Sequence, residues 1–438
     1  MMKLRWPPLF LLAWALAAAV PALGQSAFDP STMLDASQVK RGDKAVGRTV
    51  FSGVKITEFH LEIIDILKQA NLGQDMILAR ILDGPVVDRQ SGIVGGMSGS
   101  PVYVDGKLIG AVAWGWPFEK EPITGITPIR AMLEALSVME SPQAQAAPAA
   151  RSWTASRPFV VGGTRYSSAA VVAAGVKPAP GVLPLRPVMT PVNCSGFGPQ
   201  TLKLVAQKLG PLGLQPLAGG GAKADPVPVE LEPGAAVGVH LMEGDLDMTG
   251  IGTVTWRQGD RLLAFGHPMM QLGRVNMPLA TAWIHDFIPS YMRADKMGSA
   301  MTDVGSLQAD TAWSIGGRVG PRAPLIPARL EIVDQSRHYT RVFNVKVFDQ
   351  PRLTPIVLSV AISQALEAVY NPGYEGTVRT HFQVRGKRGA SLAHDNQYSV
   401  QGSPTDMAIG EVAAIMQILE DNRWEPQGVS ELVYRAEL

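Results

Sequence analysis

Residues 95–115 read GGMSGSPVYVDGKLIGAVAWG, and the expected fold is built around them. Two apolar segments flank the pair Asp105-Gly106. Such a pair is the strongest short-range signal for a β-hairpin, because type I′ turns need positive φ at both central positions. Ser98 lies in the glycine-rich part, where the backbone can turn sharply and another segment can approach its hydroxyl. The stretch therefore predicts a serine in a tight loop that leads into a β-hairpin.

The composition favours a β-rich protein of two or three domains. A chain of 438 residues can bury a large core. Its residues are 46% hydrophobic and only 18% charged, with 45 glycines and 34 prolines. That mixture favours short strands joined by turns over long helices. The formal net charge of +1 gives no reason to expect a nucleic-acid partner.

The N-terminus predicts a secretory signal. Lys3 and Arg5 precede an apolar run over 9–20, and Ala22-Leu23-Gly24 supplies small residues for cleavage before Gln25. An uncleaved membrane anchor is the alternative, but the apolar run is short for a complete span. We therefore expect no transmembrane span once the signal is removed.

The single cysteine, Cys194, excludes an intrachain disulfide. An exported protein stabilised by its core alone fits a bacterial periplasm or cell envelope better than a eukaryotic secreted scaffold. The residues around Cys194 read as a loop, which favours an inert thiol over a cysteine protease. Because the sequence has no His-Glu-x-x-His motif, cysteine pair or carboxylate-rich loop, we expect no metal or other cofactor.

Hydrophobic periodicity gives a coarse secondary structure. The stretch 54–67 fits both strand and helix, and its β-rich surroundings favour strand for the first half. Further strands are expected at 76–82, 235–241, 252–256, 323–348 and 355–362. Helices are expected at 126–136, with Thr127 as N-cap and Pro128 at the first helical position, and at 201–209 and 403–419.

A serine nucleophile needs a base within hydrogen-bond reach and a group that orients the base. His267 lies between Gly266 and Pro268, which suggests a turn that presents its ring. His60 is the rival, but it lies on the polar face of an alternating strand, so we expect it to be exposed. The seven histidines are His60, His240, His267, His285, His338, His381 and His394.

Two blocks resemble the SpoIVB family of sporulation serine peptidases. The first comprises GIVGGMSGSP at 92–101 and GKLIGAV at 106–112. The second, GIGTVTWRQGDRLLAFGHPM at 250–269, looks like the block around that family's catalytic histidine. In the sporulation peptidases the histidine block comes first. The resemblance therefore implies a permuted arrangement here.

The resemblance also implies roles for individual residues. Ser98 would be the nucleophile, and His267 the general base and then the acid. Asp83, at the end of a strand upstream of Ser98, would hold the imidazole, with Asp88 as the fallback. The amides of Gly96 and Ser98 would form the oxyanion hole.

A substrate groove is expected beside the second hairpin strand. An extended peptide would bind along the strand that ends at Trp114 and Gly115, through main-chain hydrogen bonds. Burial of the Trp114 ring in the core is the equally weighted alternative.

We expect a mostly β fold, with a chymotrypsin-like double β-barrel assembled from two separated segments and a C-terminal β-rich domain with a terminal helix. The expected divisions are a signal peptide (1–24), a serine-block barrel (31–140), a linker (141–151), an intervening α/β segment (152–224), a histidine-block barrel (225–320) and the C-terminal domain (321–438). The site would lie where the two barrels meet.

The expected function is that of an exported serine endopeptidase that acts on a peptide or protein substrate. The resemblance favours a regulatory or self-processing role. A non-catalytic envelope protein that keeps the peptidase fold is one alternative, and a small-molecule esterase is another. The sequence does not determine the oligomeric state.

Overall fold

The computed structural model describes residues 27–68, 74–115, 121–141, 152–171, 178–219, 227–290, 292–370, 376–400, 404–422, 424 and 428–438. Strands make up 54% and helices 17%, so the protein is mostly β, as the sequence predicts. The predicted signal peptide and residues 142–151 of the predicted linker lie outside the described residues.

The first barrel is a closed ring of six antiparallel strands. Around the ring the order is β1-β5-β6-β7-β3-β2, and β2 pairs back with β1. Its strands are β1 (Lys44–Val50), β2 (Ile56–Lys68), β3 (Met76–Ile81), β5 (Pro101–Val104), β6 (Lys107–Gly115) and β7 (Ile123–Pro128). Strands β8 (Ser152–Val161), β9 (Thr164–Val171) and β10 (Val182–Pro187) extend this sheet from β2 round to β6.

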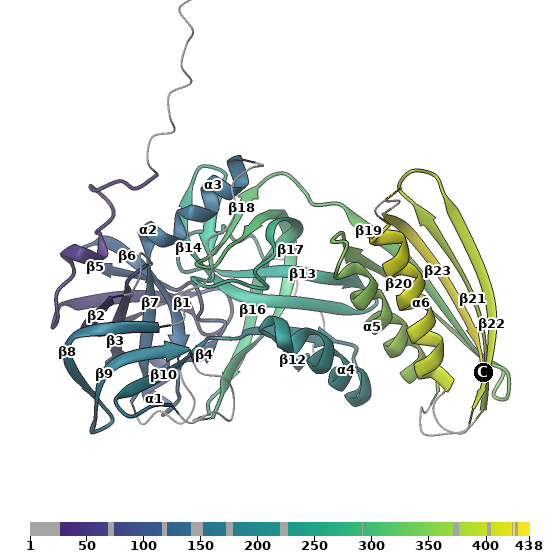
Figure 1. Ribbon diagram of the computed structural model, residues 1–438, viewed down its shortest axis with the longest axis horizontal. Helices are drawn as coiled ribbons and strands as arrows, with labels where there is room; N and C mark the ends of the chain where they lie inside the picture. The colour runs from purple at the N-terminus through teal and green to yellow at the C-terminus, as the bar shows by residue number, and fades with distance from the viewer. Residues whose placement is uncertain are drawn as a thin grey trace, which may run out of the picture.

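The second barrel is also a closed antiparallel ring of six strands. The order is β13-β14-β15-β18-β17-β16, and β16 pairs back with β13. Its strands are β13 (Ala236–Gly244), β14 (Asp247–Gln258), β15 (Arg261–Ala264), β16 (Gly273–Ile288), β17 (Ala294–Asp310) and β18 (Ile315–Val319). The two barrels lie next to each other (Figure 1), which is consistent with a chymotrypsin-like double barrel.

Further elements extend the second sheet in both directions. On one side are β11 (Thr190–Ser195) and β12 (Leu214–Gly219), with helix α4 (Pro199–Leu209) between them in the chain. On the other side β13 also pairs with β20, and the sheet continues in the order β20-β19-β23-β21-β22. These C-terminal strands are β19 (Leu325–Asp334), β20 (Tyr339–Phe348), β21 (Gly376–Gly386), β22 (Ser391–Val400) and β23 (Val429–Glu437).

Two long helices, α5 (Thr354–Glu367) and α6 (Pro404–Glu420), cover one face of the C-terminal strands (Figure 1). The remaining elements are short: α1 (Pro85–Asp88), α2 (Ile129–Met132), α3 (Glu134–Glu140), β4 (Val94–Gly95) and the 3₁₀ turns Ala36–Gln38 and Gly210–Leu212. The expected intervening segment divides between the two sheets, since β8 to β10 join the first and β11 and β12 the second. The predicted domain boundaries stay a prediction.

The expected strand at 355–362 is wrong, because these residues lie in helix α5. Val357, Leu358, Val360 and Ile362 are all fully buried, so this stretch is a short run of buried apolar residues. A short apolar run of this kind cannot be told from a buried strand by periodicity alone. Pro355 in the first turn was the available signal for a helix.

The expected helix start at 126–128 is also wrong. Strand β7 runs to Pro128, and the helical residues begin at Ile129. Thr127 is therefore a strand residue and no N-cap, and its hydroxyl accepts a hydrogen bond from the Trp114 indole N–H at 3.3 Å. In contrast, the ambiguous stretch 54–67 is strand from Ile56 onward.

None of the helices in the described part of the chain is long and apolar enough to cross a membrane.

Candidate active site

The predicted hairpin is present. Strands β5 and β6 are joined through Asp105 and Gly106, whose φ angles are +49° and +75°. Positive φ at both central positions is the type I′ requirement, and a glycine meets it without steric cost. The Asp105-Gly106 turn therefore accounts for the hairpin, as the sequence predicts.

The Ser98 loop precedes this hairpin and is tightly folded. Gly96 and Gly99 have φ angles of +91° and +94°. The Ser100 hydroxyl donates to the Met97 carbonyl at 2.6 Å, which occupies it within the loop. Of the two serines, Ser98 is thus the one whose hydroxyl does not hold the loop together.

The second barrel donates hydrogen bonds to the backbone carbonyl groups of the Ser98 loop. The Thr253 N–H donates to the Ser98 carbonyl at 2.8 Å, and the Thr253 hydroxyl donates to the Gly96 carbonyl at 2.8 Å. The Thr255 hydroxyl donates to the Gly99 carbonyl at 2.7 Å. Strand β4, just before the loop, pairs in parallel with β17. The loop between β4 and β5 is therefore bound to both barrels.

The segment before His267 packs against the same loop. Phe265 and Gly266 have φ angles of +71° and +70°, so the chain turns sharply as it leaves β15. A Cβ atom on Gly99 would lie 2.4 Å from the Phe265 amide nitrogen, and one on Gly266 would lie 3.2 Å from the Val112 carbonyl oxygen of β6. The two blocks that resemble the SpoIVB family thus meet in space between the barrels.

Ser98 and His267 both carry a buried reactive atom. Their exposed fractions are 1% and 2%. Within the described residues, neither Oγ of Ser98 nor Nε2 of His267 has a hydrogen-bond partner. Buried polar atoms are normally satisfied, so each orphaned atom needs an explanation.

The ring of His267 is held in one tautomer. Its Nδ1 lies 2.7 Å from the carbonyl oxygen of Pro268, which can only accept, so Nδ1 carries the proton. Nε2 is left as the acceptor. Burial lowers the pKa of His267 to about 4, although the hydrogen bond to Pro268 opposes the shift. The imidazole is therefore neutral near pH 7, as a general base must be.

Asp310 fixes the loop that carries His267. Its fully buried carboxylate accepts the amides of Met269 and Met270, each at 2.8 Å, and that of Leu272 at 3.2 Å. Burial raises the pKa of Asp310 to about 6, against the opposing effect of these amide donors. Sequence reasoning missed Asp310, because it follows His267 by 43 positions and its contacts depend on the pairing of β16 with β17.

A buried lysine lies under the Ser98 loop. Lys296 is fully buried, and its Nζ donates to the Thr49 hydroxyl at 2.8 Å. Its stem packs on Gly96, where a Cβ atom would lie 3.0 Å from Cδ of Lys296. Burial lowers the pKa of Lys296 to about 7. No pattern in the sequence predicts this burial, since a lone lysine in a strand normally faces solvent.

Asp83, the predicted orienting residue, lies beside His60. Its carboxylate accepts both the backbone N–H and the ring Nδ1–H of His60, each at 2.7 Å. The side chains of His60 and Asp83 are 58% and 52% exposed, as the alternating pattern predicts for His60. Asp88, the fallback, is exposed at the end of α1. A role for Asp83 in catalysis stays a prediction, which needs a movement toward His267.

Trp114 belongs to the core. Its side chain is 3% exposed and packs edge-on against Trp153, with ring centroids 5.4 Å apart. Strand β6 at Trp114 and Gly115 pairs with β7 on one side and with β10 on the other. A peptide could add to β6 here only if β10 moved away, and the predicted groove role stays a prediction.

The comparison with curated proteins gave no match. The comparison with protein families matched residues 24–129, about a quarter of the chain, which include Asp83 and Ser98 but not His267. The matching family is described as SpoIVB peptidase S55, so this segment of the chain is similar to the SpoIVB-type peptidases.

Proposed function

We propose that the protein is an exported serine endopeptidase in which Ser98 is the nucleophile and His267 the general base. One observation carries this proposal: a serine hydroxyl and a neutral imidazole nitrogen, both buried and both without a hydrogen-bond partner within the described residues, lie on two loops that pack against each other. A substrate carbonyl entering between the loops would give both atoms a function.

The reaction would follow the acyl-enzyme route. Oγ of Ser98 attacks the scissile carbonyl carbon while its proton passes to Nε2 of His267. The C–N bond then breaks, and the imidazolium gives that proton to the leaving amine. Water next attacks the acyl-enzyme, with His267 accepting its proton and returning it to Oγ. The products are one carboxylic acid and one amine, and the enzyme is regenerated.

The loop also supports the proposed oxyanion hole. Its carbonyls at Gly96, Ser98 and Gly99 are all engaged by Thr253 or Thr255, which fixes the orientation of the peptide groups. In the described part of the chain, the Ser98 N–H has no backbone acceptor. A fixed donor of this kind is worth about 10²–10³ in rate in acyl transfer.

The hydrogen bond from His267 to Pro268 supplies part of what a triad carboxylate normally supplies. It sets the tautomer and the direction of the ring, but a neutral carbonyl stabilises the imidazolium less than a carboxylate does. We therefore propose a slow and selective peptidase. The resemblance to the sporulation peptidases favours a regulatory or self-processing role, and the N-terminal signal favours the periplasm or cell envelope of a bacterium.

A non-catalytic binding protein with the same fold is the second candidate. It is favoured by the pairing of Asp83 with His60, since within the described residues His267 then has no carboxylate partner. Such a protein would keep both barrels and bind peptide without turnover.

A fluorophosphonate probe separates the two candidates. Labelling of the wild type that is lost in Ser98→Ala and kept in Ser100→Ala would support the enzyme, since the Ser100 hydroxyl is occupied by Met97. Equal labelling of wild type and Ser98→Ala, or none in either, would support the binding protein. Turnover of esters without peptides would identify an esterase. N-terminal sequencing of the protein recovered from the periplasm tests export.

A further inference from the structure

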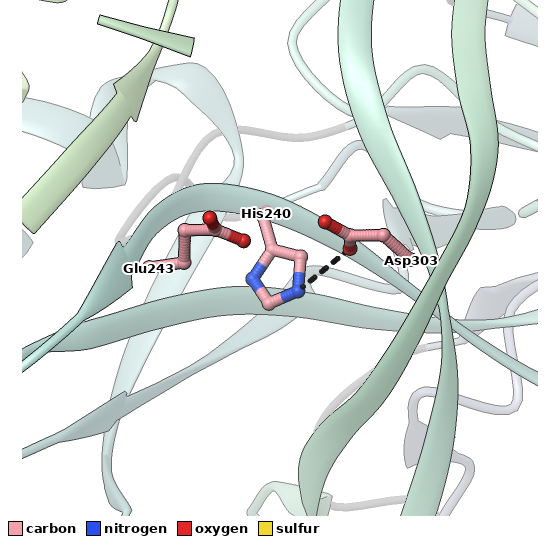
Figure 2. A group of neighbouring side chains, drawn as sticks. All are labelled: His240, Glu243 and Asp303. Carbon is pink, nitrogen blue, oxygen red and sulfur yellow. Dashed lines mark ion pairs between the residues drawn. The ribbon is translucent and has the colours of Figure 1, made fainter. Parts of the chain in front are cut away.

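A second cluster of reactive side chains lies in the second barrel. His240 and Glu243 come from β13 and Asp303 from β17. Their candidate ligand atoms all lie within 4.8 Å of one another. Figure 2 shows the imidazole of His240 between the two carboxyl groups. Neither of the residues proposed for catalysis belongs to this cluster.

Two irregularities in the strands bring these side chains together. His240 and Glu243 are three positions apart, so in a regular strand they would face opposite sides. The register of β13 against β14 shifts between His240 and Met242, which inserts one extra residue and turns Glu243 to the side of His240. The register of β17 against β16 shifts at Asp303 as well. Bulges of this kind re-aim side chains at functional sites.

A hydrogen bond at Nδ1, on the side of the ring away from Asp303, orients His240. The Thr249 hydroxyl donates its one proton to Asp247 at 2.7 Å. It can then only accept from Nδ1 of His240, which lies 3.0 Å away. Nδ1 therefore carries a proton, and Nε2 faces Oδ1 of Asp303. A histidine whose far nitrogen is tied to a carboxylate in this way is the usual metal-binding arrangement.

The distance across the cluster fits a shared ion. Nε2 of His240 lies 3.3 Å from Oδ1 of Asp303, longer than the roughly 2.7–2.9 Å of a charge-assisted hydrogen bond. Oδ1 of Asp303 is buried and, within the described residues, accepts no hydrogen bond. Two ligands held about 2.0–2.1 Å from one tetrahedral zinc ion lie about 3.3–3.4 Å apart.

The charges around the cluster also favour a cation. Three carboxylates, of Asp247, Glu243 and Asp303, surround one imidazole. Nζ of Lys346 pairs with Oε1 of Glu243 at 3.1 Å. The positive charge of Arg322 contributes to lowering the pKa of Asp303. A proton on His240 is the rival occupant, since despite the opposing effect of burial Asp247 and Asp303 raise its pKa to about 10.

The cluster is open to solvent on one side. The side chain of His240 is 4% exposed, whereas those of Asp303 and Glu243 are 24% and 19% exposed. An ion could therefore reach the imidazole past the two carboxylates.

We propose that His240, Glu243 and Asp303 bind one divalent transition-metal ion of the zinc type, with Asp247 and Thr249 orienting the imidazole. The ion ties β13 to β17 across β16 and thereby stabilises the second barrel. The ion takes no part in the chemistry at Ser98. The metal site and the proposed peptidase activity are therefore tested independently.

The test uses the full mature chain without an affinity tag, freed of metal with EDTA. Isothermal titration with Zn²⁺ should show one equivalent bound per chain, and the midpoint of thermal unfolding should rise with zinc concentration. Co²⁺ should give visible absorption bands that Zn²⁺ removes. His240→Ala and Asp303→Asn should each weaken zinc binding by more than about tenfold, and Asp247→Asn by about 10–100-fold.

The matched control is His381→Ala, which removes a histidine from the exposed pair with Asp395 at 2.7 Å and should leave zinc binding unchanged. Absence of saturable binding by the wild type would overturn the proposal. So would zinc binding by Asp303→Asn and Asp247→Asn that is as strong as that of the wild type. These two variants conserve side-chain size and keep the test valid if His240→Ala does not fold.

Discussion

Asp83 accepts two hydrogen bonds from His60, one from the backbone N–H and one from the ring, both at 2.7 Å. His60 lies within β2 and Asp83 just after β3, and both side chains are about half exposed. His267, by contrast, has its Nδ1 at the Pro268 carbonyl. The structure thus separates the predicted base from its predicted carboxylate.

The first prediction follows from this pairing. Asp83→Asn and His60→Asn should each lower kcat/KM by less than about tenfold, whereas His267→Asn should lower it by about 10³-fold or more, because only His267 lies beside the Ser98 loop. Steady-state hydrolysis of a peptide library measures all three. A loss of about 10⁴-fold in Asp83→Asn alone would show that Asp83 swings to His267 when substrate binds.

The second prediction concerns acid pH. Burial lowers the pKa of His267 to about 4, and only the neutral imidazole can accept the Ser98 proton. The acid limb of the kcat/KM profile should therefore have its midpoint near pH 4, well below the value of about 6.5 for an ordinary histidine. Labelling by a fluorophosphonate between pH 3 and 8 follows the same group. A midpoint near 6.5 would contradict the buried, neutral state of the ring.

The third prediction tests the loop support. Asp310→Asn can accept at one oxygen only, so at least one of the three amides at Met269, Met270 and Leu272 loses its partner. An unsatisfied buried donor costs about 1–3 kcal/mol in unfolding free energy. The fluorophosphonate labelling rate should fall about tenfold or more as His267 loses its position. Asp260→Asn, at an exposed pair with Arg318, is the control and should change neither quantity.

The fourth prediction concerns the pH dependence of stability. The pKa of Lys296 is about 7 in the folded protein, below the value of about 10.4 expected when unfolded. Between these values the unfolded chain binds the extra proton, so the unfolding free energy should rise as the pH rises from 7 toward 10. Lys296→Met should remove this rise, and Lys107→Met, at an exposed lysine, should keep it. Urea unfolding at pH 7 and 9.5 measures the change in unfolding free energy. The same change in wild type and Lys296→Met would contradict this prediction.

The fifth prediction concerns the contact between the barrels. A Cβ on Gly99 would lie 2.0 Å from the Thr253 carbonyl oxygen, so Gly99→Ala must push the loop off β14. It should abolish labelling of Ser98 and lower stability by several times the cost of Gly106→Ala. Gly106 also has positive φ, but a Cβ there would meet nothing within 4 Å, and its substitution should cost only about 1–2 kcal/mol. Equal losses in the two variants would contradict the tight contact.

Local signals in the sequence predicted local structure well. The hairpin at Asp105 and Gly106 was predictable because its turn type depends on two residues. Helix α5 was not, because an apolar run around Val357 fits a buried helix and a buried strand equally.

Some long-range contacts at the site could be predicted from the sequence, and others could not. The meeting of the Ser98 and His267 blocks could be expected only from the family resemblance. The support of the His267 loop by Asp310 and the pairing of Asp83 with His60 depend on strand register, which no local pattern encodes. The cluster at His240 depends on two bulges and was invisible for the same reason.

The hydrogen bonds from Thr253 and Thr255 to the Ser98 loop have a consequence for how a protein of this fold can evolve. Because the loop is attached to the second barrel by hydrogen bonds rather than by sequence continuity, either barrel can come first in the gene without disturbing this contact. A rearranged open reading frame would then encode the same interface, and the order of the blocks would record ancestry more than mechanism.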